Sequence, residues 1–209
     1  MKSDLTCPVE ITKVKVDREK EDTKEHEQIV CLIEFFNLSE KMIDSLQMNI
    51  ICFDAEGTRL GGRLVRSAAT GEGRAHFSGT FMPEHVDGAV RVEAAVEKVW
   101  FKDGVLWRRE ERNVREYTPN QLPQGRELDR LRAVAGPDAA GYAREDDIVW
   151  MCVCGRANRT SDDKCLRCER KREEVLEKYS FAAIDATVGQ KERDRQKSTE
   201  ETLRRSSEQ

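Results

Sequence analysis

The sequence has no long apolar run. Its opening stretch, MKSDLTCPVEITK, contains no apolar segment of signal-peptide length, and nothing in the chain approaches the roughly 18 apolar residues of a membrane-spanning helix. No hydrophobic segment precedes Cys7, which argues against lipoprotein processing. We therefore expect a cytoplasmic protein with no membrane partner. In that reducing compartment, clustered cysteines more often bind metal or take part in redox chemistry than form structural disulfides.

The sequence also lacks the motifs of common catalytic sites. It contains no Gly-x-Ser-x-Gly elbow, no phosphate-binding loop and no His-Glu-x-x-His motif. The GEG stretch at 71–73 has neither the third glycine nor the following helix of a dinucleotide site. His26, His76 and His85 are scattered without metal-ligand spacing, as expected of surface or edge-strand histidines. These absences predict that the protein is not an enzyme and has no catalytic residues.

Neither sign of charge dominates the chain. Its 209 residues include 36 Lys and Arg against 40 Asp and Glu, so the net charge is −4. This balance gives no overall attraction to nucleic acid or to an anionic membrane. Hydrophobic residues make up 38% of the chain and charged residues 36%, so a core must be concentrated in part of the sequence.

Residues 8–113 have the pattern of a β-sheet domain. The apolar run VCLIEFF at 30–36 ends in an Asn-Leu-Ser turn signal. In the next run, alternation places Leu46, Met48, Ile50 and Cys52 on one face of a strand. Cys31 and Cys52 are then expected as small buried hydrophobic residues. Six or seven short strands without helical periodicity between them favour an antiparallel β-sandwich over a parallel sheet.

The segment VEKVWFKDGVLWRRE predicts a hairpin. Asp103-Gly104 suits a two-residue type I′ turn, which would place Trp100 opposite Trp107. A three-residue turn would shift the pairing by one residue. We expect both tryptophans to pack within the sandwich rather than form an exposed docking patch.

The sequence IVCLIEFFNLSEKMIDSLQMNIICFDAEGTRL resembles the central hairpin of bacterial immunoglobulin-like domains of the FxLyD type. The shared pattern covers about residues 27–60: a strand, an Asn-x-Ser turn, a long strand, and an aromatic residue followed by Asp-x-x-Gly. The resemblance implies an immunoglobulin-like β-sandwich and implies no chemistry.

The composition changes after the β region. Residues 114–147 include the stretch YTPNQLPQG, typical of a linker, and a short helix at 126–134 that Gly136-Pro137 should stop. Residues 171–209 begin as a charged helix with Val175, Leu176 and Tyr179 on one side. From Lys191 onward we expect a disordered tail or a solvated helix.

Between these segments lie Cys152-x-Cys154 and Cys165-x-x-Cys168. Two close pairs of thiols can supply the four tetrahedral ligands of one structural Zn²⁺. Gly155, directly after the first pair, can adopt the backbone dihedrals that a tight knuckle requires. Four cysteine ligands would leave no open position for catalysis. An iron–sulfur cluster and a redox-active thiol site use the same residue type and are the alternatives.

The wider pattern, Trp150-x-Cys152 and Cys154-x-x-x-Asn158 followed by the second pair, resembles the Ran-binding-protein type of zinc finger. The resemblance implies that Trp150 covers the metal site and that Asn158 ties the two knuckles together through backbone hydrogen bonds. The first pair departs from that family, which usually has two to four residues between these cysteines. In this respect residues 148–170 look more like the short zinc ribbons that follow β-domains in bacterial proteins.

These features favour a non-enzymatic protein-interaction module with a structural zinc site. The alternative is a nucleic-acid-associated regulator that binds RNA or DNA through Arg156, Arg159, Arg167 and Arg170. Residues 156–172 hold seven basic and three acidic residues, and a Zn²⁺ with four thiolates carries −2, which leaves an excess of about +2. That excess is weak for a phosphate-tracking surface. A third class is a thiol sensor that releases zinc on oxidation.

Overall fold

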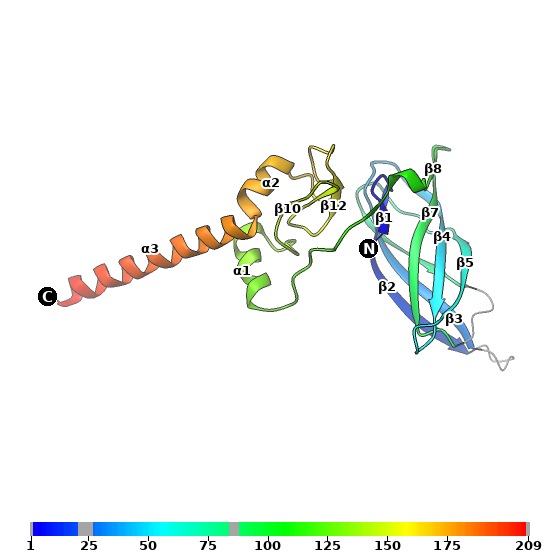
Figure 1. The fold of residues 1–209 in the computed structure, drawn as a ribbon, viewed down its shortest axis with the longest axis horizontal. Helices are drawn as coiled ribbons and strands as arrows, with labels where there is room; N and C mark the ends of the chain where they lie inside the picture. Colours follow the sequence, from blue (N-terminus) through cyan, green and yellow to red (C-terminus); the bar gives the residue numbers. More distant parts are fainter. Residues whose placement is uncertain (1, 21–26, 84–87, 208–209) are drawn as a thin grey trace. The chain divides into compact units, whose positions relative to one another are not determined.

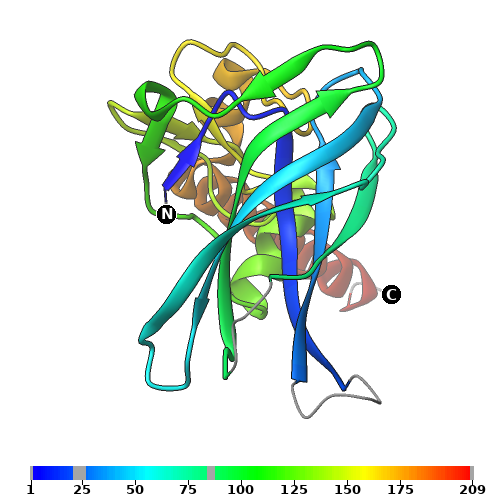
Figure 2. The same ribbon diagram turned by 90° about the vertical axis from the view of Figure 1, so that its right-hand side faces the viewer.

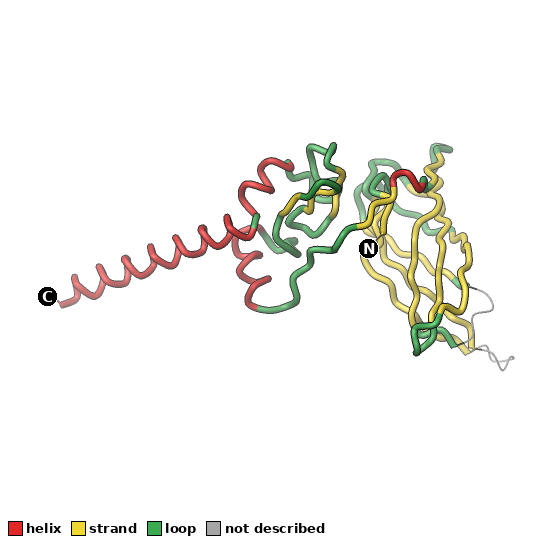
Figure 3. The backbone as a smooth tube through the Cα atoms, in the orientation of Figure 1, coloured by secondary structure: helices red, strands yellow, loops and turns green. Residues whose placement is uncertain are grey.

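The computed structural model describes residues 2–20, 27–83 and 88–207, and the chain divides into two units (Figure 1). Residues 3–114 form the β unit, and residues 115–209 form the helical unit, to which residues 1–2 are also assigned. Figure 3 shows strands throughout the first unit and long helical segments in the second. The prediction of a mainly β protein with antiparallel sheets and a C-terminal helix is confirmed.

The β unit contains two antiparallel sheets that share one core (Figures 1 and 2). The three-stranded sheet has the order β2 (Val9–Lys20), β3 (Glu27–Asn37), β6 (His76–Phe81). The four-stranded sheet has the order β5 (Arg59–Ser67), β4 (Ile43–Phe53), β7 (Arg91–Phe101), β8 (Leu106–Arg108). The single-turn helix η1 (Glu111–Asn113) follows, and the short strands β1 (Lys2–Asp4) and β9 (Val114–Glu116) form a two-stranded sheet.

Alternation along the strands explains the core of the β unit. Leu46, Met48, Ile50 and Cys52 are all completely buried, as the strand pattern predicts. Cys31, on β3 of the other sheet, is also completely buried and belongs to the same cluster. Burial, followed by the charge of Cys52, raises the pKa of the Cys31 thiol to about 11. Both cysteines are therefore core residues, as predicted.

The turn between β7 and β8 differs from the preferred prediction. Trp100 pairs with Leu106 and Val99 pairs with Trp107, so the loop has three residues and the pairing is shifted by one. Gly104 takes a φ of 84°, and Phe101 N–H donates to the Val105 carbonyl over 2.9 Å. This is a type I turn followed by a glycine bulge, which an Asp-Gly sequence suits as well as a type I′ turn.

The shift places the two tryptophans on opposite faces of the sheet. Trp107 packs against the core of the β unit, as predicted. Trp100 lies instead on the outer face, where the Arg66 guanidinium stacks over its ring. His76 lies on the edge strand β6, whereas His26 and His85 fall outside the described residues.

The helical unit has a small sheet and three helices. The antiparallel sheet has the order β10 (Arg144–Glu145), β11 (Val149–Met151), β12 (Ala157–Arg159). The helices are α1 (Arg126–Ala135), α2 (Arg172–Tyr179) and α3 (Phe181–Ser207). None of the helices in the described part of the chain combines the length and hydropathy that a membrane span requires.

Helix α1 begins and ends close to the predicted bounds. It buries Leu128 and Leu131, and Gly136 ends it with a φ of 104°. The stretch before α1 also belongs to this unit, because Leu122 packs against the cluster around the cysteines and its N–H donates to the Ala140 carbonyl over 2.8 Å.

Helices α2 and α3 are separated at Ser180, whose hydroxyl accepts a hydrogen bond from Ala183 N–H. Val175 on α2 and Ile184 on α3 are buried in the cysteine-containing cluster. Residues 191–200 of α3 are exposed on all sides, so this part is a solvated helix.

Candidate metal centre

The first cysteine pair sits in the hairpin turn between β11 and β12. Cys152 N–H donates to the Arg156 carbonyl and Gly155 N–H donates to the Cys152 carbonyl, both over 2.8 Å. Gly155 has a φ of 86°, which a residue with a Cβ rarely adopts. The loop has three residues, and Cys154 lies in its middle. This turn explains the unusual Cys-x-Cys spacing, because it brings both thiols to one side with a single residue between them.

The second pair forms a separate knuckle. Cys165 N–H donates to the Arg170 carbonyl and Glu169 N–H donates to the Cys165 carbonyl, each over 2.9 Å. Glu169 has a φ of 61°, so the position after Cys168 is left-handed without being glycine. The antiparallel bridge between Lys164 and Lys171 closes the base of this knuckle.

The fold brings all four predicted ligands together. Their Sγ atoms lie within 4.8 Å of one another, with 3.5 Å between Cys152 and Cys168 and 3.6 Å between Cys154 and Cys165. Four sulfurs bound tetrahedrally at about 2.3 Å from a metal would be about 3.8 Å apart, whereas disulfide sulfurs are about 2.05 Å apart. The arrangement therefore fits one metal ion in a tetrathiolate site and does not fit disulfides.

The four thiols titrate as a coupled set. Hydrogen bonds with the other three cysteines, followed by burial, raise the pKa of Cys152 well above its ordinary value. Hydrogen bonds from Cys152 and Cys154 lower the pKa of Cys165 to about 7, and the same kind of contact lowers the pKa of Cys168 well below its usual range. A metal ion bound to the four sulfurs would displace the protons that these thiols still carry.

Asn158 joins the two knuckles. Its side chain is completely buried, and its Nδ2 donates to the Arg156 carbonyl over 3.2 Å. Its Oδ1 accepts a hydrogen bond from Leu166 N–H, inside the second knuckle, over 3.1 Å. This is the backbone-bridging geometry that the sequence resemblance implies for Asn158.

Trp150 lies directly opposite Asn158 in the β11–β12 pair. The Trp150 side chain is completely buried and belongs to the same cluster as the cysteines. Its Nε1 donates to the Asp162 carbonyl over 3.0 Å, so the ring also holds the loop between the knuckles. Trp150 is therefore part of the packing around the site and is not available as an exposed stacking surface.

Arg170 anchors the second knuckle to helix α1. Its guanidinium makes two contacts with Asp138, at 2.6 and 2.8 Å, and donates to the Ala135 carbonyl at the end of α1 over 3.1 Å. Arg170 N–H donates to Cys168 Sγ, which contributes to the lowered pKa of that thiol. The sequence reasoning missed this role, because Asp138 lies 32 residues away and no local motif links the two.

The other three arginines of the predicted basic surface are also engaged within the unit. Arg159 contacts the Asp162 carboxylate, with a shortest distance of 2.7 Å, and Arg167 donates to the Cys154 carbonyl over 2.9 Å. Arg156 is only 7% exposed. Arg159, Arg167 and Arg170 therefore have partners inside the unit, and the Arg156 side chain is buried there.

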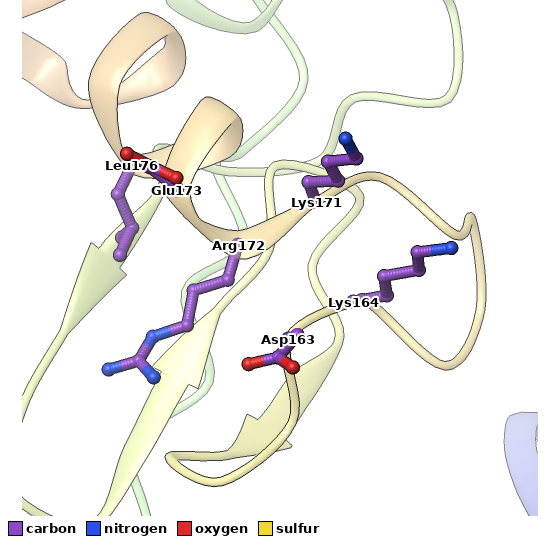
Figure 4. A pocket seen from close by; sticks show the side chains of 6 residues that line it. All are labelled: Asp163, Lys164, Lys171, Arg172, Glu173 and Leu176. Carbon is purple, nitrogen blue, oxygen red and sulfur yellow. The ribbon is translucent and has the colours of Figure 1, made fainter.

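A hollow of about 360 Å³ lies beside the second knuckle (Figure 4). Its lining consists of Asp163, Lys164, Lys171, Arg172, Glu173 and Leu176. Figure 4 shows Lys164 and Lys171 extending in the same direction from neighbouring backbone segments, while Arg172 extends the other way. Arg172 contacts Glu145 and the Thr160 carbonyl, whereas neither lysine has a carboxylate within ion-pair distance in the described part of the chain.

Comparisons with protein-family models, with curated proteins and with solved structures found no match to this chain. Four cysteines placed by two knuckles could hold one metal ion, which would then have sulfur on every side.

Proposed function

We propose that the protein is a non-enzymatic, cytoplasmic protein-interaction module with one structural Zn²⁺ bound to Cys152, Cys154, Cys165 and Cys168. The observation that carries the proposal is the closed set of four sulfurs within 4.8 Å of one another. Zinc accepts such a tetrahedral thiolate site without redox chemistry, and a closed site has no position for a substrate or water. None of the seven cysteines, all of which lie in the described part of the chain, forms a disulfide, and a reducing compartment preserves that state.

The role of the zinc is to organise the helical unit. The cysteines sit among buried residues of α1, α2 and α3, such as Leu131, Val175 and Ile184. The strands around them have only two or three residues each, too short to hold the knuckles without another link. Metal binding supplies about 10–16 kcal/mol in small structural zinc sites, enough to fold a unit of this size.

We propose that a protein partner docks at the hollow beside the second knuckle. Lys164 and Lys171 are directly opposed across an antiparallel bridge, an arrangement that like charges disfavour. Leu176 adds an apolar surface to the same hollow. These features suit a partner segment that presents acidic side chains next to an apolar one.

The nucleic-acid alternative has less support at the ribbon. It relied on Arg156, Arg159, Arg167 and Arg170, and these side chains are buried or held by partners within the helical unit. Phosphate binding there would have to displace contacts that hold the knuckles together.

For the β unit, we propose an immunoglobulin-like sandwich of the FxLyD type. The support is the strand order, with β2, β3 and β6 in one sheet and β5, β4, β7 and β8 in the other. Consecutive strands β3 and β4 lie in different sheets, as do β5 and β6, which is typical of Greek-key sandwiches. The inner faces of both sheets contribute to one core.

Two measurements test the function. Elemental analysis of the purified full chain should find one zinc per chain, and stoichiometric iron or no metal would refute the zinc assignment. Crosslinking with mass spectrometry should identify partner peptides at the helical unit, and Lys164→Glu with Lys171→Glu should abolish these crosslinks. Lys13→Glu with Lys15→Glu is the matched control on the β unit. Crosslinks that survive the first pair of substitutions and disappear with the control would place the interaction elsewhere.

A further inference from the structure

The outer face of the four-stranded sheet is strongly basic. Since Leu46, Met48, Ile50 and Cys52 point into the core, the intervening residues of β4 and their cross-strand partners lie on the outer face. The charged residues that the strand register places on this face are Arg59, Arg66, Arg91, Lys98, Arg108 and Glu93. Five positive charges and one negative charge give +4, in a chain with a net charge of −4.

Two further acidic residues, Glu97 and Asp44, lie at β-bulges near this face, and the face stays positively charged when both are counted. Glu97 lies at the bulge between β4 and β7 and forms a 3.2 Å ion pair with Arg109. Asp44 lies at the other bulge, near the start of β4. In the described part of the chain, no carboxylate lies within ion-pair distance of Arg59, Arg66, Lys98 or Arg108. The positive charge of this face is therefore mostly unneutralised.

Two aromatic rings lie among these cations, each beneath a guanidinium. The Arg66 guanidinium lies 4.2 Å from the centre of the Trp100 ring, and the Arg91 guanidinium lies 3.9 Å from the centre of the Phe53 ring. Arg66 is also held by a 3.1 Å hydrogen bond to the Ser45 hydroxyl. Rings and guanidinium planes are the two kinds of side-chain surface on which nucleic-acid bases stack.

The two stacks are well separated, and both polar and apolar side chains lie between them, including Leu64, which pairs with Asn49 and is 63% exposed. Ser45 pairs with Trp100 and Phe53 pairs with Arg91, and eight residues of β4 at about 3.3 Å each place the stacks about 26 Å apart. Gln47 and Asn49 lie on β4 between them. A methyl group at Gly62 would lie 3.2 Å from an Arg59 guanidinium nitrogen, so the glycine leaves room for Arg59 to lie close to the sheet.

We propose that this outer face binds single-stranded nucleic acid. Bases stack on the Trp100–Arg66 and Phe53–Arg91 pairs, and phosphates contact Arg59, Lys98 and Arg108. A positive surface with interleaved aromatic stacks is typical of proteins that bind single strands without strong sequence preference. An acidic protein would use the charges but not the stacked rings, so the observations favour nucleic acid. The proposal does not rest on the metal site.

The test uses the full-length, metal-loaded chain and a fluorescein-labelled 16-nucleotide strand, as oligo(dT) and as oligo(U), in fluorescence anisotropy at several salt concentrations. Binding is expected at 50 mM salt and should weaken steeply as salt rises. Lys98→Gln with Arg108→Gln should weaken binding at least tenfold and reduce the magnitude of the log–log salt slope by about 1.4. Trp100→Leu keeps the charge and should weaken binding by about fivefold or more.

Two control pairs remove the same charge from other surfaces: Lys13→Gln with Lys15→Gln on β2, and Lys164→Gln with Lys171→Gln on the ribbon. Both should leave binding unchanged, and thermal melting checks that every variant is folded. Absence of binding at 50 mM salt would overturn the proposal. So would a loss of binding only in the ribbon pair, or displacement of the strand by polyglutamate as readily as by unlabelled oligonucleotide.

Discussion

The β unit and the helical unit use the same turn for different purposes. Phe101 to Val105 and Cys152 to Arg156 are both three-residue hairpin loops closed by two backbone hydrogen bonds, of 2.9 and 3.0 Å in the first and 2.8 Å each in the second. In each loop a glycine takes the left-handed conformation, with φ of 84° at Gly104 and 86° at Gly155. The turns differ in what holds the chain on either side.

In the β unit, the turn begins at the end of the eleven-residue strand β7, which is paired with the equally long β4 over a large apolar core. In the helical unit, the turn joins two strands of three residues each, and the adjoining core contains the four cysteines. The same local geometry is thus found beside a large apolar core and beside four cysteines that could hold a metal ion. This comparison leads to the view that one unit folds without metal and the other requires it.

Metal removal should separate the two units most clearly. On treatment with a strong chelator, the helical unit should lose hydrogen-exchange protection across α1, α2 and β10–β12, because about 10–16 kcal/mol of binding free energy is lost. The β unit should keep the protection of its strands. Hydrogen exchange with mass spectrometry, read peptide by peptide before and after zinc is restored, checks this outcome. Equal loss of protection in both units would contradict the comparison.

The next largest effect is expected from replacing Asn158, and Asn49 in the β unit provides the matched control. Asn158→Ala removes both hydrogen bonds that bridge the knuckles, each worth about 0.5–1.5 kcal/mol, so it should destabilise the helical unit by about 1–3 kcal/mol. Metal affinity should also fall by about 10–100-fold, as for lost outer-shell contacts. Asn49→Ala, on the outer face of β4, should change stability by no more than about 0.5 kcal/mol. Denaturant titration and zinc competition with a chromogenic chelator measure both.

Alkaline pH should weaken the β unit in particular. Burial raises the pKa of Cys31 to about 11 from its ordinary value of 9.0, so the unfolded chain ionises this thiol at lower pH than the folded chain does. Below pH 9 the Cys31 thiol keeps its proton in both the folded and the unfolded state. Above pH 9 the unfolded state loses this proton first. The free energy of unfolding should therefore fall between pH 9 and pH 11, by up to about 2 kcal/mol.

Cys31→Ala removes this titration, and its unfolding free energy should show a shallower dependence on pH over the same range. Urea titrations at pH 8, 9, 10 and 11 give the comparison, with the fluorescence of Trp100 and Trp107 in a Trp150→Phe background as the probe of the β unit. An identical pH dependence in the variant and the natural chain would rule out Cys31 as the cause.

The two turn glycines offer the smallest and most closely matched test. The Cβ that Gly104→Ala adds would have no atom within 4 Å. The substitution should therefore lower the free energy of unfolding by about 1 kcal/mol, because alanine disfavours the left-handed backbone. Gly155→Ala has the same backbone strain, and its Cβ would also lie 3.1 Å from the Ala140 Cβ. It should therefore destabilise its own unit more than Gly104→Ala does, and it should weaken zinc binding, which Gly104→Ala leaves unchanged. Equal effects on both units would show that the metal knuckle adds no constraint.

The parts of the structure that could be predicted from sequence are those with local signals. The ligand set follows from the spacing of Cys152, Cys154, Cys165 and Cys168, and the fold brings these four together. Helix α1 follows from its apolar spacing and the glycine after it. The buried face of β4 follows from strict alternation.

The features that could not be predicted depend on contacts between distant residues or on a local ambiguity. Asp103-Gly104 suits two kinds of turn, so the register of β7 and β8 depended on the packing of Trp107 against the core. Arg170 forms an ion pair with Asp138, which lies 32 residues earlier in the chain, and no sequence motif indicates this contact. The basic residues of the outer face are dispersed over the three strands β5, β7 and β8, so the face emerges only when the sheet register is known.

X-ray absorption spectroscopy at the zinc edge, on the purified full-length chain, tests the central claim most directly. The claim is that four cysteine sulfurs enclose one structural zinc ion and thereby organise the helical unit. The spectrum should fit four sulfur neighbours at about 2.3 Å with no nitrogen or oxygen in the first shell. A mixed shell with fewer than four sulfurs, or a chain whose helical unit is folded without stoichiometric zinc, would contradict it.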